Sequence, residues 1–249
     1  MAAFVQVKSV VLAAGSTTIV ATFPGTVGAG NAVCGVIGYD TGLTLTTVTD
    51  DKSNTYTIQR TVTDGGNAEQ ASLFYLANIT NGPITVTATF NGVTNNGGMT
   101  MLEGSGIVTS SALDVETGQL QATPGTGANG VTSGAVTTTV AGDFVCGFAV
   151  DTGAFRTGTQ YAAGTGFTKP ANGESGDAAG HALDNAGEYQ IQGSAGSIAA
   201  TWTAAANDAT ISFVIALKAS GGGGLTAAQV MPAIAEAMSG GVVIGRVDA

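Results

Sequence analysis

Apolar and β-branched residues recur along this chain in short runs that alternate with polar residues or stand between turn sequences. Residues 6–20 are dense in β-branched side chains and are interrupted at 13–16, which predicts two short strands joined by a turn. The apolar run at 32–39 is typical of a central strand. Residues 44–49 and 55–62 alternate on either side of a polar turn. No helical period appears in the first hundred residues, so the pattern indicates an all-β fold.

The same pattern continues in the rest of the chain. It predicts further strands over residues 71–77, 84–90, 99–102, 135–140, 144–150, 198–203 and 210–217. Residues 152–188 are rich in Gly, Ala and Asn and show little β pattern. Long loops of this kind are usually functional or mobile, so we expect 152–188 to form an excursion at one end of a sandwich.

Two segments of the chain resemble each other. Residues 30–42 and 142–153 both carry Gly-(Asn/Asp)-x-Val-Cys-Gly and both end in Asp-Thr-Gly. The order of the later predicted strands also repeats, which indicates two related halves near 4–106 and 107–219. Because each half supplies only about four main strands, we expect the halves to intertwine in one antiparallel, jelly-roll-like β-sandwich over residues 1–219.

A Gly-rich linker at 220–224 separates the sandwich from a C-terminal segment at 225–249. Thr226 and Gln229 have the spacing of a capping box, which predicts a short α-helix, although Pro232 interrupts the pattern. Apolar positions on one face of that helix and in the tail after it are the candidate assembly residues. They are Val230, Ile234, Met238, Val242, Val243 and Ile244. A short helix is marginal in water, so this segment is expected to dock on a neighbouring subunit or, alternatively, on its own sandwich.

Charge is scarce and mostly negative. Charged residues make up 10% of the chain, with seven Lys and Arg against 17 Asp and Glu and a net charge of −10. The basic residues are scattered, so we expect no binding of nucleic acid or of an anionic membrane. A charge-poor surface suits a protein that neighbouring subunits cover. The first residues lack the pattern of a signal peptide, so we expect synthesis in the cytoplasm.

The order of motifs resembles a β-sandwich module of phage virion proteins and some bacterial surface proteins. The motifs are Thr-Val-Thr-Asp-Asp-Lys-Ser-Asn-Thr-Tyr at 47–56, Leu-Phe-Tyr-Leu-Ala-Asn-Ile at 73–79, Met-Leu-Glu-Gly-Ser-Gly at 101–106 and Ala-Leu-Asp at 112–114. In that family a Glu-Tyr-Ser-Gly segment closes the first half, and here Gly104 replaces the tyrosine.

The resemblance implies a subunit on the virion surface: a capsid decoration protein, a head fibre or a tail-associated protein. The partners it implies are further copies of the chain, as a homo-oligomer such as a trimer, and major capsid or tail proteins. The alternative hypothesis is a tail or fibre module that binds a receptor or a host surface glycan through 152–188. The resemblance carries no catalytic residues to this chain.

Candidate catalytic residues are few. His181 is the only histidine and has Asp184 nearby in the sequence, but no Gly-x-Ser-x-Gly motif accompanies them. Glu103 and Asp114 are the candidate pair for glycoside hydrolysis, although their place after a strand and beside a Gly-rich turn favours a turn-capping role. We therefore expect a non-enzymatic protein without a cofactor.

The sequence also contains candidate metal ligands and two cysteines. Asp50, Asp51, Ser53 and Asn54 offer oxygens for Ca²⁺, but their spacing favours an Asx-type turn. Cys34 and Cys146 lie at equivalent points of the two repeats in apolar runs, which favours buried free thiols. A disulfide between the halves stays open as the alternative, provided that the equivalent strands are neighbours.

Overall fold

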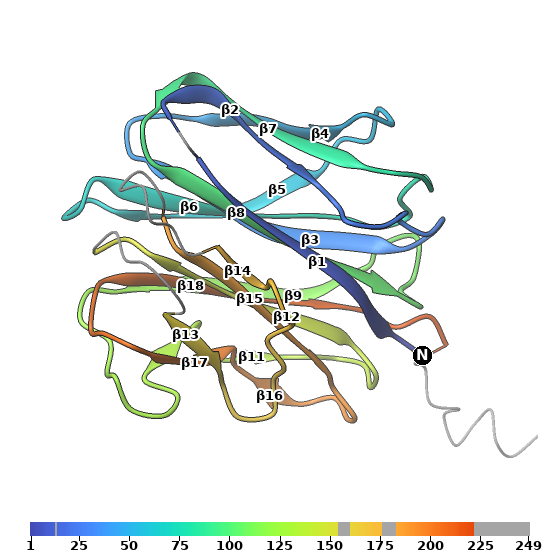
Figure 1. Cartoon of the computed structure of the whole chain (residues 1–249). Coiled ribbons are helices and arrows are strands. Elements are labelled where there is room, and N and C mark those ends of the chain that lie inside the picture. Colours follow the sequence, from blue (N-terminus) through green and yellow to red (C-terminus); the bar gives the residue numbers. More distant parts are fainter. Residues whose placement is uncertain (13, 154–159, 176–182, 222–249) are drawn as a thin grey trace, which may run out of the picture.

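The computed structural model describes residues 1–12, 14–153, 160–175 and 183–221 (Figure 1). All of its strand pairings are antiparallel, and no helix occurs in these ranges, so the all-β prediction is confirmed for this part of the chain. The helix and tail predicted at 225–249, with all six candidate assembly residues, lie outside the described residues.

The first half of the chain forms two sheets. Its strands are β1 (Ala3–Val11), β2 (Ser16–Thr22), β3 (Ala32–Asp40), β4 (Leu45–Asp50), β5 (Thr57–Asp64), β6 (Glu69–Leu76), β7 (Thr85–Thr94) and β8 (Gly97–Ser105). One sheet has the order β1-β8-β3-β6-β5 and the other the order β2-β7-β4. Strands from the two ends of this half, β1 and β8, thus lie side by side.

The second half repeats this arrangement. Its strands are β9 (Leu113–Gln121), β10 (Val131–Thr132), β11 (Val136–Thr137), β12 (Phe144–Asp151), β13 (Tyr161–Ala163), β14 (Glu174–Ser175), β15 (Asn185–Ile191), β16 (Ser197–Ile198), β17 (Thr201–Ala204) and β18 (Thr210–Leu217). The five-stranded sheet has the order β14-β15-β12-β18-β9, and two small sheets, β10-β17-β13 and β11-β16, take the place of β2-β7-β4.

The registers of the central strands confirm that the two halves are related. Cys34 in β3 pairs with Leu102 on one side and Tyr75 on the other. Cys146 in β12 has Ile215 and Tyr189 in the same two places. The repeat seen in the sequence therefore corresponds to a repeat of strand order and register.

The expectation that the halves intertwine is wrong for the described residues. Every named strand before residue 106 pairs within the first half, and every named strand after residue 112 pairs within the second. The sequence predicted too few strands in each half to close a sandwich. In the second half, β9 and β15 were missed because they lack a clear apolar alternation. Residues 185–188, expected to be part of an irregular loop, begin β15, which is an internal strand of its sheet.

The sheets are stacked in four layers, with the two five-stranded sheets in the middle (Figure 1). Between these two sheets lies a core that both halves build, including Val36, Leu102, Phe148 and Phe213. A second core fills the space between the two sheets of the first half, around residues such as Phe74. The outer side of the second half has two smaller cores.

Glycines let the two middle sheets approach each other closely. A Cβ built on Gly104 would lie 2.5 Å from the ring of Phe144, and one built on Gly187 would lie 2.7 Å from Leu102. Both distances are shorter than real contacts allow. Phe144 thus fills the space beside position 104, which gives a physical reason for a glycine there.

The connection between the halves runs along one end of the stack. Ile107 forms a β-bridge with Ala219, and the N–H of Val108 donates to the carbonyl of Lys218 at 3.0 Å. The N–H of Ser220 donates to the carbonyl of Gly106 at 2.7 Å. The chain therefore leaves the sandwich at the seam between its halves.

Candidate binding groove

Two adjoining hollows lie where the edge strand β1 of the first half meets the edge strand β14 of the second. One has a volume of about 380 Å³ and is lined by residues 169–174. The other, of about 320 Å³, is lined by residues 8–11 of β1 together with Asn172, Glu174 and Ser175. Because Asn172 and Glu174 line both hollows, we treat the two as one groove, called the edge groove below.

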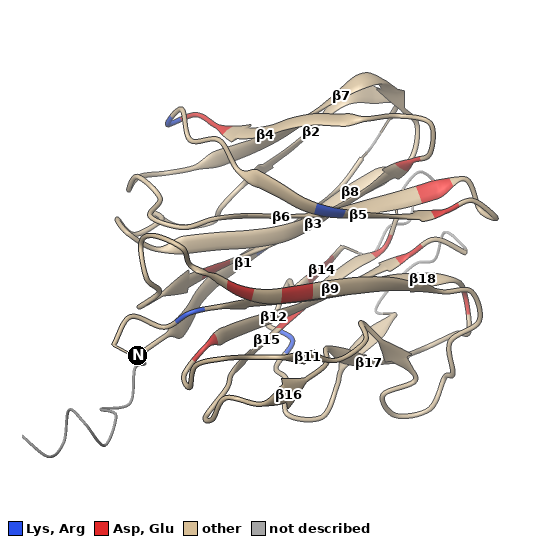
Figure 2. Ribbon diagram, turned by 180° about the vertical axis from the view of Figure 1, so that it is seen from behind, with Lys and Arg blue, Asp and Glu red and all other residues tan. Residues whose placement is uncertain are grey.

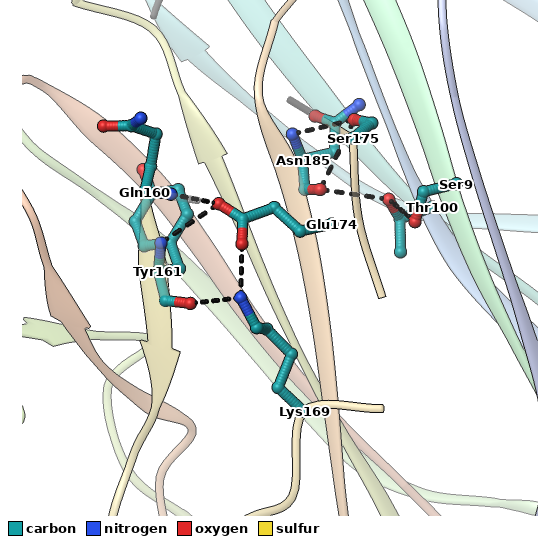
Figure 3. Close-up of polar contacts among 8 residues, drawn as sticks. All are labelled: Ser9, Thr100, Gln160, Tyr161, Lys169, Glu174, Ser175 and Asn185. Atoms are coloured by element: carbon teal, nitrogen blue, oxygen red, sulfur yellow. Dashed lines mark hydrogen bonds and ion pairs between the residues drawn. The ribbon is translucent and has the colours of Figure 1, made fainter. Parts of the chain in front are cut away.

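Glu174 holds the wall of the edge groove in place. Its Oε1 accepts the backbone N–H groups of Gln160 at 2.5 Å and Tyr161 at 3.0 Å, and its other oxygen forms an ion pair with Lys169 (Figure 3). Lys169 Nζ also donates to the carbonyl of Tyr161 at 2.5 Å. The side chains of Lys169 and Glu174 are 19% and 8% exposed, so the pair is partly shielded from water and stronger than an ordinary surface pair.

Two lining residues of the edge groove, Ser9 and Ser175, belong to hydrogen bonds that connect the two halves. Ser175 Oγ accepts the N–H of Asn185 at 3.2 Å (Figure 3). The hydroxyl of Thr100, in β8 of the first half, lies 3.2 Å from the carbonyl of the same Asn185 and 2.9 Å from Ser9 Oγ. Hydroxyl and amide groups thus connect β1, β8, β15 and β14.

The turn that borders the edge groove has a strained residue. Asn172 has a φ of 64°, and the N–H of Gly173 donates to the carbonyl of Pro170 at 2.9 Å. Asn tolerates this left-handed backbone better than most residues. The amide of Asn172, the hydroxyls of Ser9 and Ser175 and the ammonium of Lys8 give the edge groove mainly hydrogen-bonding groups, which suit a ligand rich in hydroxyls.

Sequence reasoning placed a binding role in 152–188 but did not find the contribution of β1. Residues 8–11 read only as part of a strand, because nothing in their pattern shows that β1 is an edge strand beside a distant segment. The described part of 152–188 does line the groove, from Lys169 to Ser175.

Glu103 and Asp114 bind different turns. Glu103 is fully buried and accepts hydrogen bonds from Gln6 Nε2 at 2.6 Å, the N–H of Gly28 at 2.9 Å and Asn31 Nδ2 at 2.5 Å. Asp114 accepts the N–H and the hydroxyl of Thr139, each at 2.5 Å. Both contacts are those of turn-capping residues, the role that the sequence favoured.

The acidic turn after β4 is an Asx-type turn, as the sequence favoured. Asp50 Oδ1 accepts the N–H groups of Lys52 at 2.9 Å and Asn54 at 3.0 Å, and its Oδ2 accepts the hydroxyl of Tyr56 at 3.1 Å. In the described ranges, no group of three or more His, Cys, Asp or Glu side chains is arranged to hold a metal ion.

The remaining candidates from the sequence are the two cysteines and the histidine. Cys34 and Cys146 are both buried and free, and they face each other across the central core. His181, for which the sequence favoured an ordinary loop histidine over a catalytic one, lies outside the described residues.

Comparisons with models of protein families, with curated proteins and with solved structures found no match. Within the described ranges, no helix has the length and apolar character needed to cross a membrane.

Proposed function

We propose that this chain is a structural protein of a bacteriophage virion, a capsid decoration or head-fibre subunit on the particle surface. The observation that carries the proposal is the duplicated strand order. In each half, four strands of the large sheet (β1-β8-β3-β6 and β9-β18-β12-β15) face smaller sheets built from the strands between them: one such sheet in the first half and two in the second. We interpret each half as a jelly roll, an architecture that viral capsid proteins use.

A fold alone does not establish a role, so the surface also matters. Charged residues are few and scattered over both halves (Figure 2). A surface with little charge supports a protein that works in contact with neighbouring subunits.

The exit point of the chain supports a tethered anchor. Ser220, the first residue of the Gly-rich linker, is held at the seam by its bond to Gly106, and four glycines follow it directly. In this proposal the C-terminal segment at 225–249 binds a neighbouring copy or the capsid, and the sandwich extends from that attachment.

The test uses the full chain with charges added to the apolar face of the predicted helix. The double variant Ile234→Asp/Met238→Asp should lose the apolar contact that this helix makes with a neighbouring subunit in the proposal. We expect this variant to sediment as a monomer where the parent chain is oligomeric, and to be missing from particles purified after complementation, as measured by mass spectrometry.

The matched control is Ala228→Asp/Ser239→Asp, which adds the same charge on the opposite face of the same predicted helix. It should assemble like the parent chain. A parent chain that sediments as a monomer at all concentrations and is absent from purified particles would overturn the proposal.

The second candidate function is recognition of a receptor or host surface glycan, and the edge groove favours it. Its amide, hydroxyl and ammonium groups match a sugar, and it lies in the segment expected to bind. A glycan array probed with the full chain should show hits that Asn172→Gly weakens at least tenfold, since glycine keeps the backbone of that turn. Thr46→Ala, on the outer sheet, is the control. An array without hits would remove this candidate.

A further inference from the structure

Two cysteine sulfur atoms meet in the core between the two halves. Cys34 Sγ in β3 and Cys146 Sγ in β12 lie 2.9 Å apart, and neither residue has any exposed surface. The two residues are 112 positions apart in the sequence and occupy equivalent places in the repeat. No other side chain separates the sulfurs, so the two thiols are already paired by the fold.

We infer that Cys34 and Cys146 form a disulfide that locks the two halves together when the chain folds in an oxidising environment, and that they remain a thiol pair in a reducing one. A disulfide has an S–S bond of about 2.05 Å, so the sulfurs must approach further by less than one bond length. The close approach of the two middle sheets at Gly104 and Gly187 favours such a movement.

Burial determines when the bond can form. Burial, together with the neighbouring Cys34, raises the pKa of the Cys146 thiol, so the reactive thiolate is rare in the folded chain. Small oxidants also have no path to sulfurs without exposed surface. The bond therefore forms while the halves dock, or during an opening of the seam, and resists reduction afterwards.

The oxidant in this inference is a small-molecule disulfide such as oxidised glutathione. One cysteine thiolate attacks it, forming a mixed disulfide and releasing one glutathione thiolate. The second cysteine thiolate then attacks the protein sulfur of the mixed disulfide and releases the other glutathione. Two cysteine thiols are oxidised, one glutathione disulfide is reduced to two thiols, and two protons pass to the released thiolates.

The test refolds the reduced full chain in glutathione buffers of increasing oxidised fraction. After refolding, the chain is unfolded again and treated with N-ethylmaleimide, and its intact mass is measured. We expect a species that lacks two hydrogens and carries no adduct, and that takes up two adducts after reduction. Cys34→Ser and Cys146→Ser should each show one adduct or one glutathione.

Thermal unfolding then tests whether the bond acts as a lock. A cross-link that closes a loop of this length should raise the Tm of the oxidised chain by roughly 10 °C over the reduced one. The double variant Cys34→Ala/Cys146→Ala should have the same Tm in both buffers.

Two results would overturn the inference. In the first, both thiols of correctly refolded chain, judged by circular dichroism, react with N-ethylmaleimide at every glutathione ratio. In the second, the disulfide forms but the Tm falls. If the reduced chain does not refold, the native chain incubated with oxidised glutathione for days gives the same readouts.

Discussion

Phe74 and Glu188 occupy the same place in the two halves. Phe74 pairs with Gly35 in β3, and Glu188 pairs with Gly147 in β12. Each side chain covers its glycine: a Cβ built on Gly35 would lie 2.6 Å from the Phe74 ring, and one built on Gly147 would lie 2.7 Å from Glu188 Oε1. The second half thus carries a buried carboxyl group where the first half has an aromatic core residue.

Because this carboxyl group is buried, we expect it to make the stability of the chain depend on pH. Burial raises the pKa of Glu188 to about 8, against the lowering effect of the N–H of Gly164, which Glu188 accepts at 3.0 Å. In the unfolded chain a Glu pKa lies near 4.3. Below that pH both states are protonated and the contribution of Glu188 to stability is fully present. As the pH rises from about 4.3 to 8, only the unfolded state loses this proton, so the contribution of Glu188 is lost.

The expected loss between pH 5 and pH 8 is about 4 kcal/mol, at about 1.4 kcal/mol for each pH unit. Glu188→Gln should remove this part of the slope and stabilise the chain at pH 8, as measured by urea unfolding at both values. Glu69, whose pKa is raised to about 8 chiefly by burial, contributes a slope that the variant keeps. An unchanged slope in Glu188→Gln would show that the carboxyl group is ionised in the folded chain.

Gly104 should not tolerate a side chain. In Gly104→Ala the new methyl group meets the Phe144 ring at 2.5 Å, so we expect a loss of about 2 kcal/mol in urea unfolding. Gly127→Ala is the control, because a Cβ there meets nothing within 4 Å and the change should stay within about 0.5 kcal/mol. Equal effects of the two substitutions would contradict the close approach of the sheets.

Arg60 and Glu116 tie the opposite edges of the halves, from β5 to β9. Arg60 Nε and Nη2 donate to the two Glu116 oxygens at 2.6 Å and 3.0 Å. Arg60 is 40% exposed and Glu116 11%, so a double-mutant cycle with alanine should give a coupling of about 1 kcal/mol that shrinks in high salt. The exposed pair Lys52–Asp51, at 3.8 Å, is the control and should give almost none. No coupling between Arg60 and Glu116 would contradict a tie at this edge.

Glu174 should protect the backbone beside the edge groove. In Glu174→Gln the ion pair with Lys169 is lost and the bonds to the N–H groups of Gln160 and Tyr161 weaken. Hydrogen exchange at these two amides should become at least tenfold faster, as measured by NMR. Lys8→Met, which changes the other side of the same groove, should leave the two amides unaffected; acceleration in that variant as well would mean that the groove opens as a unit.

The sequence predicted the core strands well, and for a clear reason. β3, β12 and β18 are buried along almost their whole length, so each appears as an apolar run between turns. The Val-Cys-Gly repeat also marked the equivalent strands correctly. Cys34 and Cys146 were expected in the core, and they lie there.

Edge strands and contacts between distant segments could not be predicted from the pattern of apolar residues. β9 is half-buried at every position and contains Glu116, Gly118 and Gln119, so it shows no apolar alternation. The edge groove forms where β1 lies beside β14, and no local sequence pattern predicts that these two strands are neighbours. The fold class could therefore be predicted from the chain, whereas the layer arrangement and the groove required the structure.

Gly106 is touched by both ends of the described chain. A Cβ built on it would lie 2.2 Å from the Met1 carbonyl oxygen, and its own carbonyl accepts the N–H of Ser220. Residue 1 and residue 220 therefore lie at one point on the surface of the stack, so a polypeptide joined at either place would leave the sandwich from the same end.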